Sequence, residues 1–359
     1  MSVERRFINP FLFFLLKDGN IIGWDYKKHR QYELEEKYFQ RILEIARHPG
    51  VASQEIDEEL EEANFILHSN DDVQWGWDYL SKIFHFGTKI SEDDLVNEKI
   101  ADPKFFVAEN IEYSTGLLDA FPDIYTEKAG DIVTLPEPDL ISLQDIDLLR
   151  ILSQRKTSRS FDGTSINLKT LSTLLYVVFS DFHQSNDDYA QYGFQKIGMR
   201  KTSPSCGGLH PSEAYIVALN VDGLDKGVYH YQAHKHVLSV ISASNISPQM
   251  NKLLCGQYFA AQLAFGIFIT SRFDKIWHKY KHSRAYRVAL IDIGHLSQTF
   301  QLVATALGLN TWLSGVFVDT DVSSLLNIKD DSEQPLFFVG AGNGDNSPLD
   351  PLTKVKGQV

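Results

Sequence analysis

Cysteine is scarce in this sequence: Cys206 and Cys255 are the two cysteines among 359 residues. Two thiols cannot build a disulfide framework, and such low usage is typical of a reducing compartment. Metal-type ligands at a recognisable spacing are also missing, so the sequence predicts no metal site.

Positive charge is in deficit as well. The chain has 34 Lys and Arg against 47 Asp and Glu, which gives a formal net charge of −13. Nonspecific binding of DNA or RNA requires basic surface that neutralises phosphates. The composition therefore argues against nucleic acid as the main partner.

Long hydrophobic runs are absent too. The run Phe11–Leu16 is far shorter than the roughly 20 residues that a membrane-spanning helix needs. It has no small-residue cleavage site, and the turn residues Lys17–Asn20 follow it directly, so a buried strand is expected rather than a signal peptide. The protein is predicted to be cytoplasmic, with no membrane partner.

The first 115 residues predict a small domain of strands and helices. Residues 10–34 read as a β-hairpin, and the apolar spacing from Tyr38 to Ala46 predicts a helix. Pro49-Gly50 ends that helix, and Ser53 is a plausible N-cap for a second one. This arrangement resembles winged-helix-like leader-recognition domains of the PqqD fold. A family-specific extension that covers the catalytic domain or supports a dimer is the alternative.

Residues 116–147 contain three prolines and weak periodicity, and are predicted to be a linker. From 148 to 359 helical and strand patterns alternate in a second domain. The expected helices are 168–179 and 290–307, and the expected strands are 214–221, 262–271, and positions around Val316 and 335–339. Residues 182–199 are polar and predict a loop, either a mobile one near the site or a surface loop without a role in it.

Three short motifs in the second domain suggest a cofactor site. The loop Pro204-Ser205-Cys206-Gly207-Gly208 has little side-chain bulk, so its backbone N–H groups can approach a flat or phosphorylated ligand. The run Arg155-Lys156-Thr157-Ser158-Arg159 combines cations and hydroxyls suited to a phosphate. The third motif is Trp277-His-Lys279-Tyr280, followed by Ala-Tyr-Arg287.

Together these motifs resemble the SagB-type azoline dehydrogenases of the flavin-dependent nitroreductase superfamily, over roughly residues 150–345. The resemblance implies an α+β, nitroreductase-like FMN-binding fold, with a central antiparallel-rich sheet flanked by helices. It also implies which residues bind FMN: Arg155, Lys156, Thr157 and Arg159 at the phosphate, Pro204, Ser205, Cys206, Gly207 and Gly208 at the ring, and Arg287, Leu313, Ser314 and Gly315 as further contacts. Lys156 and Thr157 depart from the Arg-Arg-Ser-x-Arg pattern of the family.

The resemblance also makes Lys279 and Tyr280 the catalytic pair. Oxidation of an azoline to an azole removes a proton and a hydride from neighbouring ring carbons, so a base is required beside the flavin. Burial and the like charge of Arg284 and Arg287 are expected to lower the pKa of Lys279. The roles of two other residues stay open. Cys206 is either a nucleophile or a small buried residue, and Glu213 is either the glutamate of the family or a charge at the rim of a helix or strand.

The sequence thus predicts an FMN-dependent oxidoreductase that oxidises an azoline, or a similar modified residue, in a ribosomally made peptide. A generic NAD(P)H-dependent nitro, quinone or ene reductase and a flavin-poor scaffold in a synthetase complex are the alternatives. The expected partners are a modified precursor peptide, a cyclodehydratase or other maturation enzyme, and a second copy of the chain. The homodimer is expected because the helix face of Leu296, Phe300, Val303 and Leu307 would need a covering surface.

Overall fold

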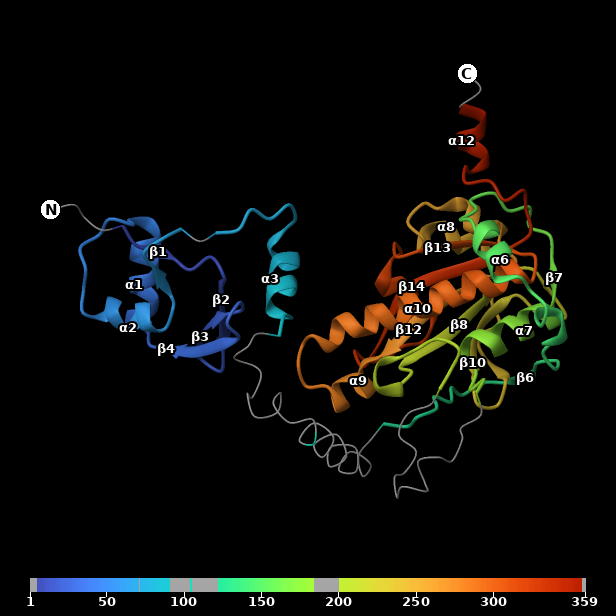
Figure 1. The fold of residues 1–359 in the computed structure, drawn as a ribbon, viewed down its shortest axis with the longest axis horizontal. Coiled ribbons are helices and arrows are strands. Elements are labelled where there is room, and N and C mark those ends of the chain that lie inside the picture. Colours follow the sequence, from blue (N-terminus) through green and yellow to red (C-terminus); the bar gives the residue numbers. More distant parts are fainter. Residues whose placement is uncertain (1–4, 71, 91–103, 105–121, 184–199, 357–359) are drawn as a thin grey trace. The chain divides into compact units, whose positions relative to one another are not determined.

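The computed structural model describes residues 5–70, 72–90, 104, 122–183 and 200–356. The chain divides into two compact units, Met1–Phe106 with His282–Arg284, and Val107–Lys281 with Ala285–Val359. Figure 1 traces the elements of each unit along the chain. Most of the polar loop predicted at 182–199, and the domain boundary predicted at 115, lie outside the described residues.

The smaller unit begins with strands and continues with helices. A three-stranded antiparallel sheet has the order β2-β3-β4, and β1 pairs separately with β5. The elements are β1 (Phe7–Ile8), β2 (Leu12–Lys17), β3 (Asn20–Asp25), β4 (Arg30–Leu34), α1 (Glu36–Arg47), α2 (Ile56–Glu62), β5 (Ile66–Leu67) and α3 (Tyr79–Gly87). The predicted hairpin is present, and Asp18 and Gly19 both have positive φ at its turn, as a tight hairpin between twisted strands requires.

A small hydrophobic core holds this unit together. Its buried members are Ile42, Ile45, Leu60, Phe65 and Ile66. Gly23 on β3 is required by the packing, because a Cβ there would lie 2.5 Å from the Phe65 ring. Ser53 is not the N-cap that the sequence predicted: α2 begins at Ile56 after Glu55, and no side chain caps it. The winged-helix assignment stays a prediction.

The larger unit is built on a seven-stranded sheet of order β13-β14-β12-β8-β10-β11-β6. Every neighbouring pair in it is antiparallel, which confirms the predicted antiparallel-rich sheet. Its strands are β6 (Ile132–Thr134), β8 (Ser212–Ala218), β10 (Gly227–Gln232), β11 (Val237–Ser242), β12 (Phe265–Arg272), β13 (Asn310–Ser314) and β14 (Glu333–Gly342), and the short parallel pair is β7 (Ile166–Asn167) with β9 (Val221–Asp222).

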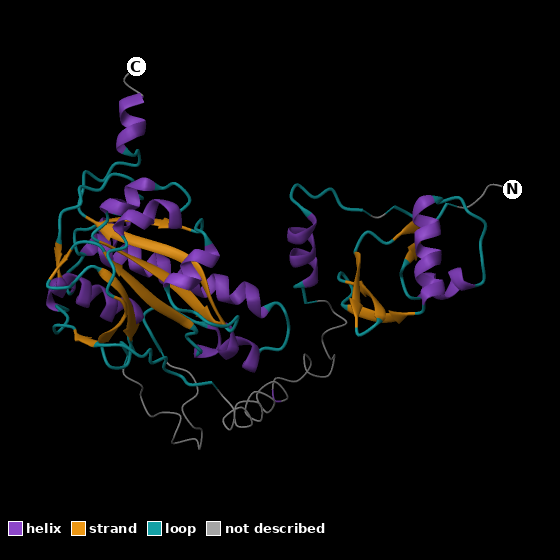
Figure 2. Cartoon of the chain, turned by 180° about the vertical axis from the view of Figure 1, so that it is seen from behind, coloured by secondary structure: helices purple, strands orange, loops and turns teal. Residues whose placement is uncertain are grey.

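Helices cover both faces of the sheet (Figure 2). The α-helices are α6 (Leu148–Gln154), α7 (Leu168–Phe179), α8 (Met250–Leu253), α9 (Phe273–Lys279), α10 (Ala285–Ala306), α11 (Asp319–Leu325) and α12 (Pro351–Lys356), and the 3-10 helices are η3 (Ile141–Leu143), η5 (Cys206–Gly208), η6 (Ser247–Gln249) and η7 (Tyr258–Gln262). Helix α7 starts where predicted, and the Asn167 side chain caps it by accepting from Thr170 N–H.

Two hydrophobic cores sandwich β8, because successive side chains on a strand point to opposite faces. Ile216 and its alternate neighbours on β8 belong to the core that includes residues of α7 and α10. Tyr215 and Val217 belong to the core that includes residues of α8, η7 and α11. Burial on both faces explains why this segment reads as a continuous apolar run.

Three details differ from the sequence prediction. Strand β6, which lies within the predicted linker, pairs with β11 and extends the sheet. Val316 lies beyond β13 rather than in a strand. Helix α10 begins at Ala285, earlier than expected, so Asp292 lies within the helix and on its buried side.

The predicted dimer face of α10 is also differently placed. Phe300 is fully buried and Leu296 nearly so in the unit's own core, and Val303 and Leu307 pack against that core. This face therefore needs no second copy of the chain. The apolar spacing was read correctly, but the sequence could not show which surface covers it.

Candidate active site

The motif loop, residues 204–208, is called here the glycine loop, and it has a backbone that only glycine adopts easily. Gly207 and Gly208 have φ of 58° and 66°, in the left-handed region. The loop forms a single 3-10 turn, Cys206–Gly208, and leads into β8 through His210 and Pro211. The sequence prediction of a tight loop with little side-chain bulk therefore describes this segment well.

Asp292 on α10 anchors the glycine loop. Ser205 Oγ donates to Asp292 Oδ2 at 2.5 Å, and Cys206 N–H donates to Asp292 Oδ1 at 3.2 Å. His210 N–H in turn donates to Ser205 Oγ at 3.0 Å. Burial raises the pKa of the Asp292 carboxyl, and the bonds from Ser205 and Cys206 oppose that rise. A small pocket lies at this contact, with Pro204, Ser205 and Asp292 in its lining.

Lys279 and Tyr280 converge on the glycine loop from the end of α9. Lys279 Nζ donates to the Gly207 carbonyl at 3.5 Å. A Cβ placed on Gly207 would lie 2.6 Å from Lys279 Nζ and 2.5 Å from Tyr280 Oη, so both side chains reach the same point of the loop. Burial is the largest cause that lowers the pKa of Lys279, and the Cys206 thiol opposes it. The structure thus brings together the pair that the sequence predicted.

The cationic run, residues 155–159, lies at the edge of the sheet. Thr157 forms a parallel bridge with Thr311 of β13, so this stretch is extended. Arg155 and Thr157 are partly buried, whereas Arg159 is exposed. Arg155 Nη1 donates to Gln301 Oε1 of α10 at 3.1 Å, and Arg159 Nη1 donates to the Pro348 carbonyl at 3.0 Å.

Lys156 is exposed and lines an open surface pocket with Gly308, Asn310 and Asn346, among others. The lining of this pocket includes neither Arg155 nor Arg159. Ser158 is fully buried.

The remaining predicted contacts lie on two elements. Leu313, Ser314 and Gly315 follow one another at the end of β13, an edge strand of the sheet. Ser314 Oγ accepts from Val316 N–H at 3.0 Å and from Gln257 Nε2 at 3.2 Å. Arg287 is half-buried in the first turn of α10.

Helix α10 connects the two halves of the candidate site. It holds the glycine loop through Asp292 and the cationic run through Gln301. These two positions are nine residues apart, or about 14 Å along the helix axis. The site is therefore elongated, with cations at one end and the Lys279–Tyr280 pair at the other.

Two buried carboxylates at this site were not recognised from sequence as anchors. Asp292 falls inside the helix predicted over 290–307, where a single acid in an apolar pattern is itself a signal of a buried contact. Glu213 was given two readings, and the structure excludes a rim charge, because the residue is 9% exposed and its carboxylate is fully hydrogen-bonded within the unit. Cys206 is a partly buried free thiol.

None of the helices in the described ranges has the length and apolar character that crossing a bilayer requires. In those same ranges, no cluster of three or more His, Cys, Asp and Glu side chains is arranged to hold a metal ion.

The sequence model of the nitroreductase family matches residues 152–343, more than half of the chain. The chain therefore belongs to the nitroreductase family, which is a family of oxidoreductases. The matched range contains the cationic run, the glycine loop and the Lys279–Tyr280 pair, and it agrees with the resemblance drawn from the motifs.

Individual relatives divide into two kinds. One relative is MJ1384 of Methanocaldococcus jannaschii, which is described as a nitroreductase. It is 28% identical over 213 residues, which cover 59% of this chain and 98% of MJ1384. The microcin B17-processing protein McbC of Escherichia coli is 25% identical over 240 residues, 64% of this chain and 83% of that one. The trifolitoxin-processing protein TfxB of Rhizobium leguminosarum is 33% identical over 116 residues, which cover 31% of this chain and 31% of TfxB.

The role of Asp292 as anchor predicts a local loss of protection. Asp292→Ala removes the acceptor for Cys206 N–H and Ser205 Oγ, and a hydrogen bond to a charged group is worth about 1.5–3 kcal/mol. Amide hydrogen exchange at Cys206 and His210 should therefore accelerate by about 10- to 100-fold. Gln298→Ala, an exposed change on the same helix, is the control. Unchanged protection in Asp292→Ala would show that the loop is held by other contacts.

Proposed function

We propose that the protein is an FMN-dependent dehydrogenase that oxidises an azoline in a ribosomally made peptide to the azole. The observation that carries the proposal is the convergence of Lys279 and Tyr280 on Gly207 of the glycine loop. A base at the loop that borders the flavin ring is what this oxidation requires and what a simple reductase does without.

The residues of the site suit FMN. Arg155, Thr157 and Arg159 lie within one short stretch, and two guanidinium groups with a hydroxyl are suited to binding a phosphate. Gly207 and Gly208 leave the loop without side chains, so a flat ring can lie against its backbone. Bound FMN would supply the hydride acceptor.

The chain itself would supply the base. Neutral Lys279 Nζ takes the proton from one ring carbon of the azoline, while the electron pair of the neighbouring C–H bond leaves with its hydrogen as hydride. Burial lowers the pKa of Lys279, which increases the neutral fraction at a given pH. Tyr280 Oη, which reaches the same point of the loop, orients the lysine or relays its proton.

The names of two relatives support a peptide substrate. McbC and TfxB are described as microcin B17-processing and trifolitoxin-processing proteins. By analogy we propose a modified precursor peptide as substrate and a cyclodehydratase as partner. We further propose that residues 1–115 recognise a leader peptide, with β2 or β4, the edge strands of their sheet, accepting it as an added strand.

The cofactor assignment predicts a flavin phosphate at the cationic run. The wild-type protein should purify with one FMN per site, and Arg155→Ala combined with Arg159→Ala should lose most of it, because each charge-assisted bond contributes about 1.5–3 kcal/mol. Flavin is measured by absorbance after denaturation. Arg150→Ala, on the exposed side of α6, is a control that should keep its flavin. Full occupancy in the double variant would refute the phosphate site.

The base assignment predicts a loss of turnover without a loss of flavin. Lys279→Ala should retain FMN but oxidise an azoline peptide about 10²–10⁴-fold more slowly, and Tyr280→Phe should have a smaller effect. The wild-type rate should rise with pH as Lys279 deprotonates. Mass spectrometry follows the two-dalton mass loss that marks oxidation of the azoline. The same assay is repeated with a peptide that lacks its leader and with a protein that lacks residues 1–115.

Controls separate this function from its rivals. Lys281→Ala removes an exposed lysine two positions away and should leave turnover unchanged. Rapid NAD(P)H oxidation without peptide, together with wild-type azoline turnover by Lys279→Ala, would favour the generic reductase instead.

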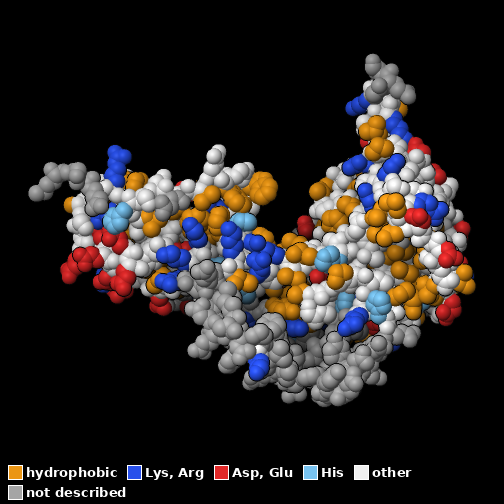
Figure 3. Space-filling model, viewed as in Figure 1, with side chains coloured by type: hydrophobic (Ala, Val, Ile, Leu, Met, Phe, Trp, Pro, Cys, Tyr) orange, Lys and Arg blue, Asp and Glu red, His pale blue; other side chains and the backbone are white. Residues whose placement is uncertain are grey.

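We also propose a homodimer, on a different face of α10 from the one expected. Tyr286, Leu290 and Ile291 are large hydrophobics that are 44%, 44% and 54% exposed. Figure 3 shows hydrophobic side chains gathered over the part of the larger unit where α9 and α10 begin. Gly294, one turn beyond Leu290, has open space where a Cβ would be, so the helix can approach another backbone closely.

This geometry predicts an interface variant that spares the fold. Gly294→Arg should convert a dimer to a monomer, because a Cβ at this exposed position has no neighbour within 4 Å, while the arginine would fill the space of the close approach. Multi-angle light scattering measures the mass. Gly76→Arg, at another glycine with open space around it, should remain dimeric. A monomeric wild-type protein that binds flavin and is active would exclude the dimer.

A further inference from the structure

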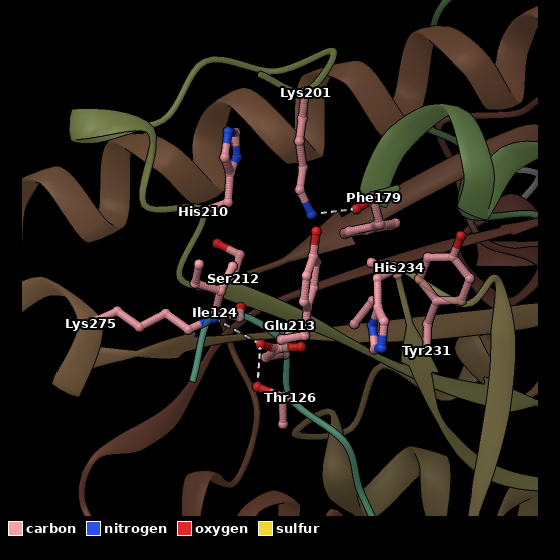
Figure 4. A pocket seen from close by; sticks show the side chains of 13 residues that line it. Ile124, Thr126, Phe179, Lys201, His210, Ser212, Glu213, Tyr231, His234 and Lys275 are labelled. Atoms are coloured by element: carbon pink, nitrogen blue, oxygen red, sulfur yellow. Dashed lines mark hydrogen bonds and ion pairs between the residues drawn. The ribbon is translucent and has the colours of Figure 1, made fainter. Parts of the chain in front are cut away.

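A cluster of buried charged side chains lies at the start of β8, close after the glycine loop in sequence. The proposed reaction does not use these side chains. The centre of the cluster is Glu213, the second residue of β8, which follows the loop after a short turn. Thr126 Oγ1 donates to Glu213 Oε1 at 2.6 Å, and His230 Nε2 bonds to Oε2 at 3.0 Å. Lys275 Nζ donates to Oε1 at 3.4 Å. Figure 4 shows Lys275 and Thr126 pointing toward the Glu213 carboxylate.

Lys275 belongs to α9, the helix that carries Lys279. Its side chain is 1% exposed, and its ammonium also donates to the Ile124 carbonyl at 2.8 Å. Residues 275 and 279 are four positions apart and therefore lie one above the other on the same face of the helix. The Glu213–Lys275 pair thus joins the strand that begins behind the glycine loop to the helix that ends at the proposed base.

The Glu213 carboxylate is ionised at neutral pH. Burial raises the pKa of Glu213, but the His230 hydrogen bond and the charges of Lys275 and His230 outweigh it and lower the pKa to about 2. Other charged groups nearby have their own partners: Arg272 bonds Asp274, Lys201 pairs with Asp181, and Lys128 pairs with Glu333.

Helix α9 depends on such contacts for its position. It has seven residues, and a helix of that length is not stable by itself in water. Arg272, the last residue of β12 and the N-cap of α9, donates its N–H to the Pro211 carbonyl at 2.8 Å, and Phe273 N–H in the first turn donates to the Ser332 carbonyl at 2.6 Å. Pro211 directly precedes β8, and Glu213, the partner of the buried Lys275, is the second residue of that strand. The start of β8 is therefore one of the supports that fix the position of α9 and of Lys279 at its end.

We propose that the Glu213–Lys275 ion pair positions Lys279 against Gly207, with Glu213 and Lys275 as positioning residues for the base. The inference rests on the proposed function of Lys279. If the pair is broken, α9 is expected to loosen, and Lys279 Nζ becomes more hydrated. Its pKa then rises toward the ordinary value of a lysine.

The test titrates Lys279 directly. Lysines of the flavin-loaded protein are ¹³C-methylated, and the Lys279 signal is assigned by its loss in Lys279→Arg. Glu213→Gln, which keeps the shape and can keep the Thr126 and His230 bonds, should raise the Lys279 pKa by about half a pH unit or more, well within the range that hydration changes produce. The pH profile of kcat for azoline oxidation should move to higher pH with it, while KM changes little.

Glu333→Gln is the matched control. Glu333 is also a buried carboxylate, at 5% exposed, and it is bonded by Tyr215, Thr270 and Lys128 rather than by any side chain of α9. Its substitution makes the same chemical change in the same sheet and should leave the Lys279 titration unchanged. A general loosening of the fold would affect both variants alike and would overturn the proposal.

The double variant Glu213→Gln with Lys275→Met guards against misfolding. Removing one partner leaves an unpaired buried charge, whereas removing both does not. The double variant should show the same rise in the Lys279 pKa as Glu213→Gln, because either change alone already breaks the pair. A folded double variant in which Lys279 titrates as in the wild type would overturn the proposal. The titration needs no substrate, so it is decided independently of whether azoline oxidation is found.

Discussion

Side chains of β8 alternate between two hydrophobic cores, and the strand can be buried on both faces only if helices cover the sheet on each side. This double burial fixes the place where the strand begins and hence where the glycine loop must turn. The loop precedes a strand that is buried on both faces, and it contacts α10 through Asp292 and the end of α9 through Lys279. The rigidity of the candidate site is therefore a property of the whole sheet and not of the loop alone.

Two buried carboxylates hold the segment that contains the loop, and their surroundings move their pKa values in opposite directions. Asp292 accepts from a hydroxyl and a backbone N–H, which do not outweigh its burial, so its pKa is raised. Glu213 faces the cationic Lys275 and a histidine donor, which do outweigh its burial. Burial thus raises the pKa in both cases, and the partners decide whether the pKa ends above or below its usual value. The second carboxylate is the one suited to an ionic contact with a neighbouring helix.

Local pattern predicted most of the elements of the larger unit. The apolar period of 168–179 gave α7, and the glycine pair with its flanking residues indicated the loop that the structure contains. The pattern could not say which surface covers an apolar face, so Leu296 and Phe300 were assigned to a partner although they pack within the chain. Strand β6 was not predicted because a segment of three residues between prolines is too short to show the alternation of a strand. Its pairing with β11 is a long-range contact that local sequence does not reveal. The anchoring contacts of Glu213 and Asp292 were not predicted for the same reason, because their partners lie far away in sequence.

The crowding at Gly207 has a consequence for how such a site can change over time. A Cβ on Gly207 would lie 2.6 Å from Lys279 Nζ and 2.5 Å from Tyr280 Oη, and the φ of 58° at this position disfavours any other residue. A larger residue at 207 is therefore tolerated only if the pair at 279 and 280 retreats or shrinks in the same variant. The loop and the helix end are thus expected to diverge together, as one inherited unit, whenever a lineage acquires a different chemistry on this fold.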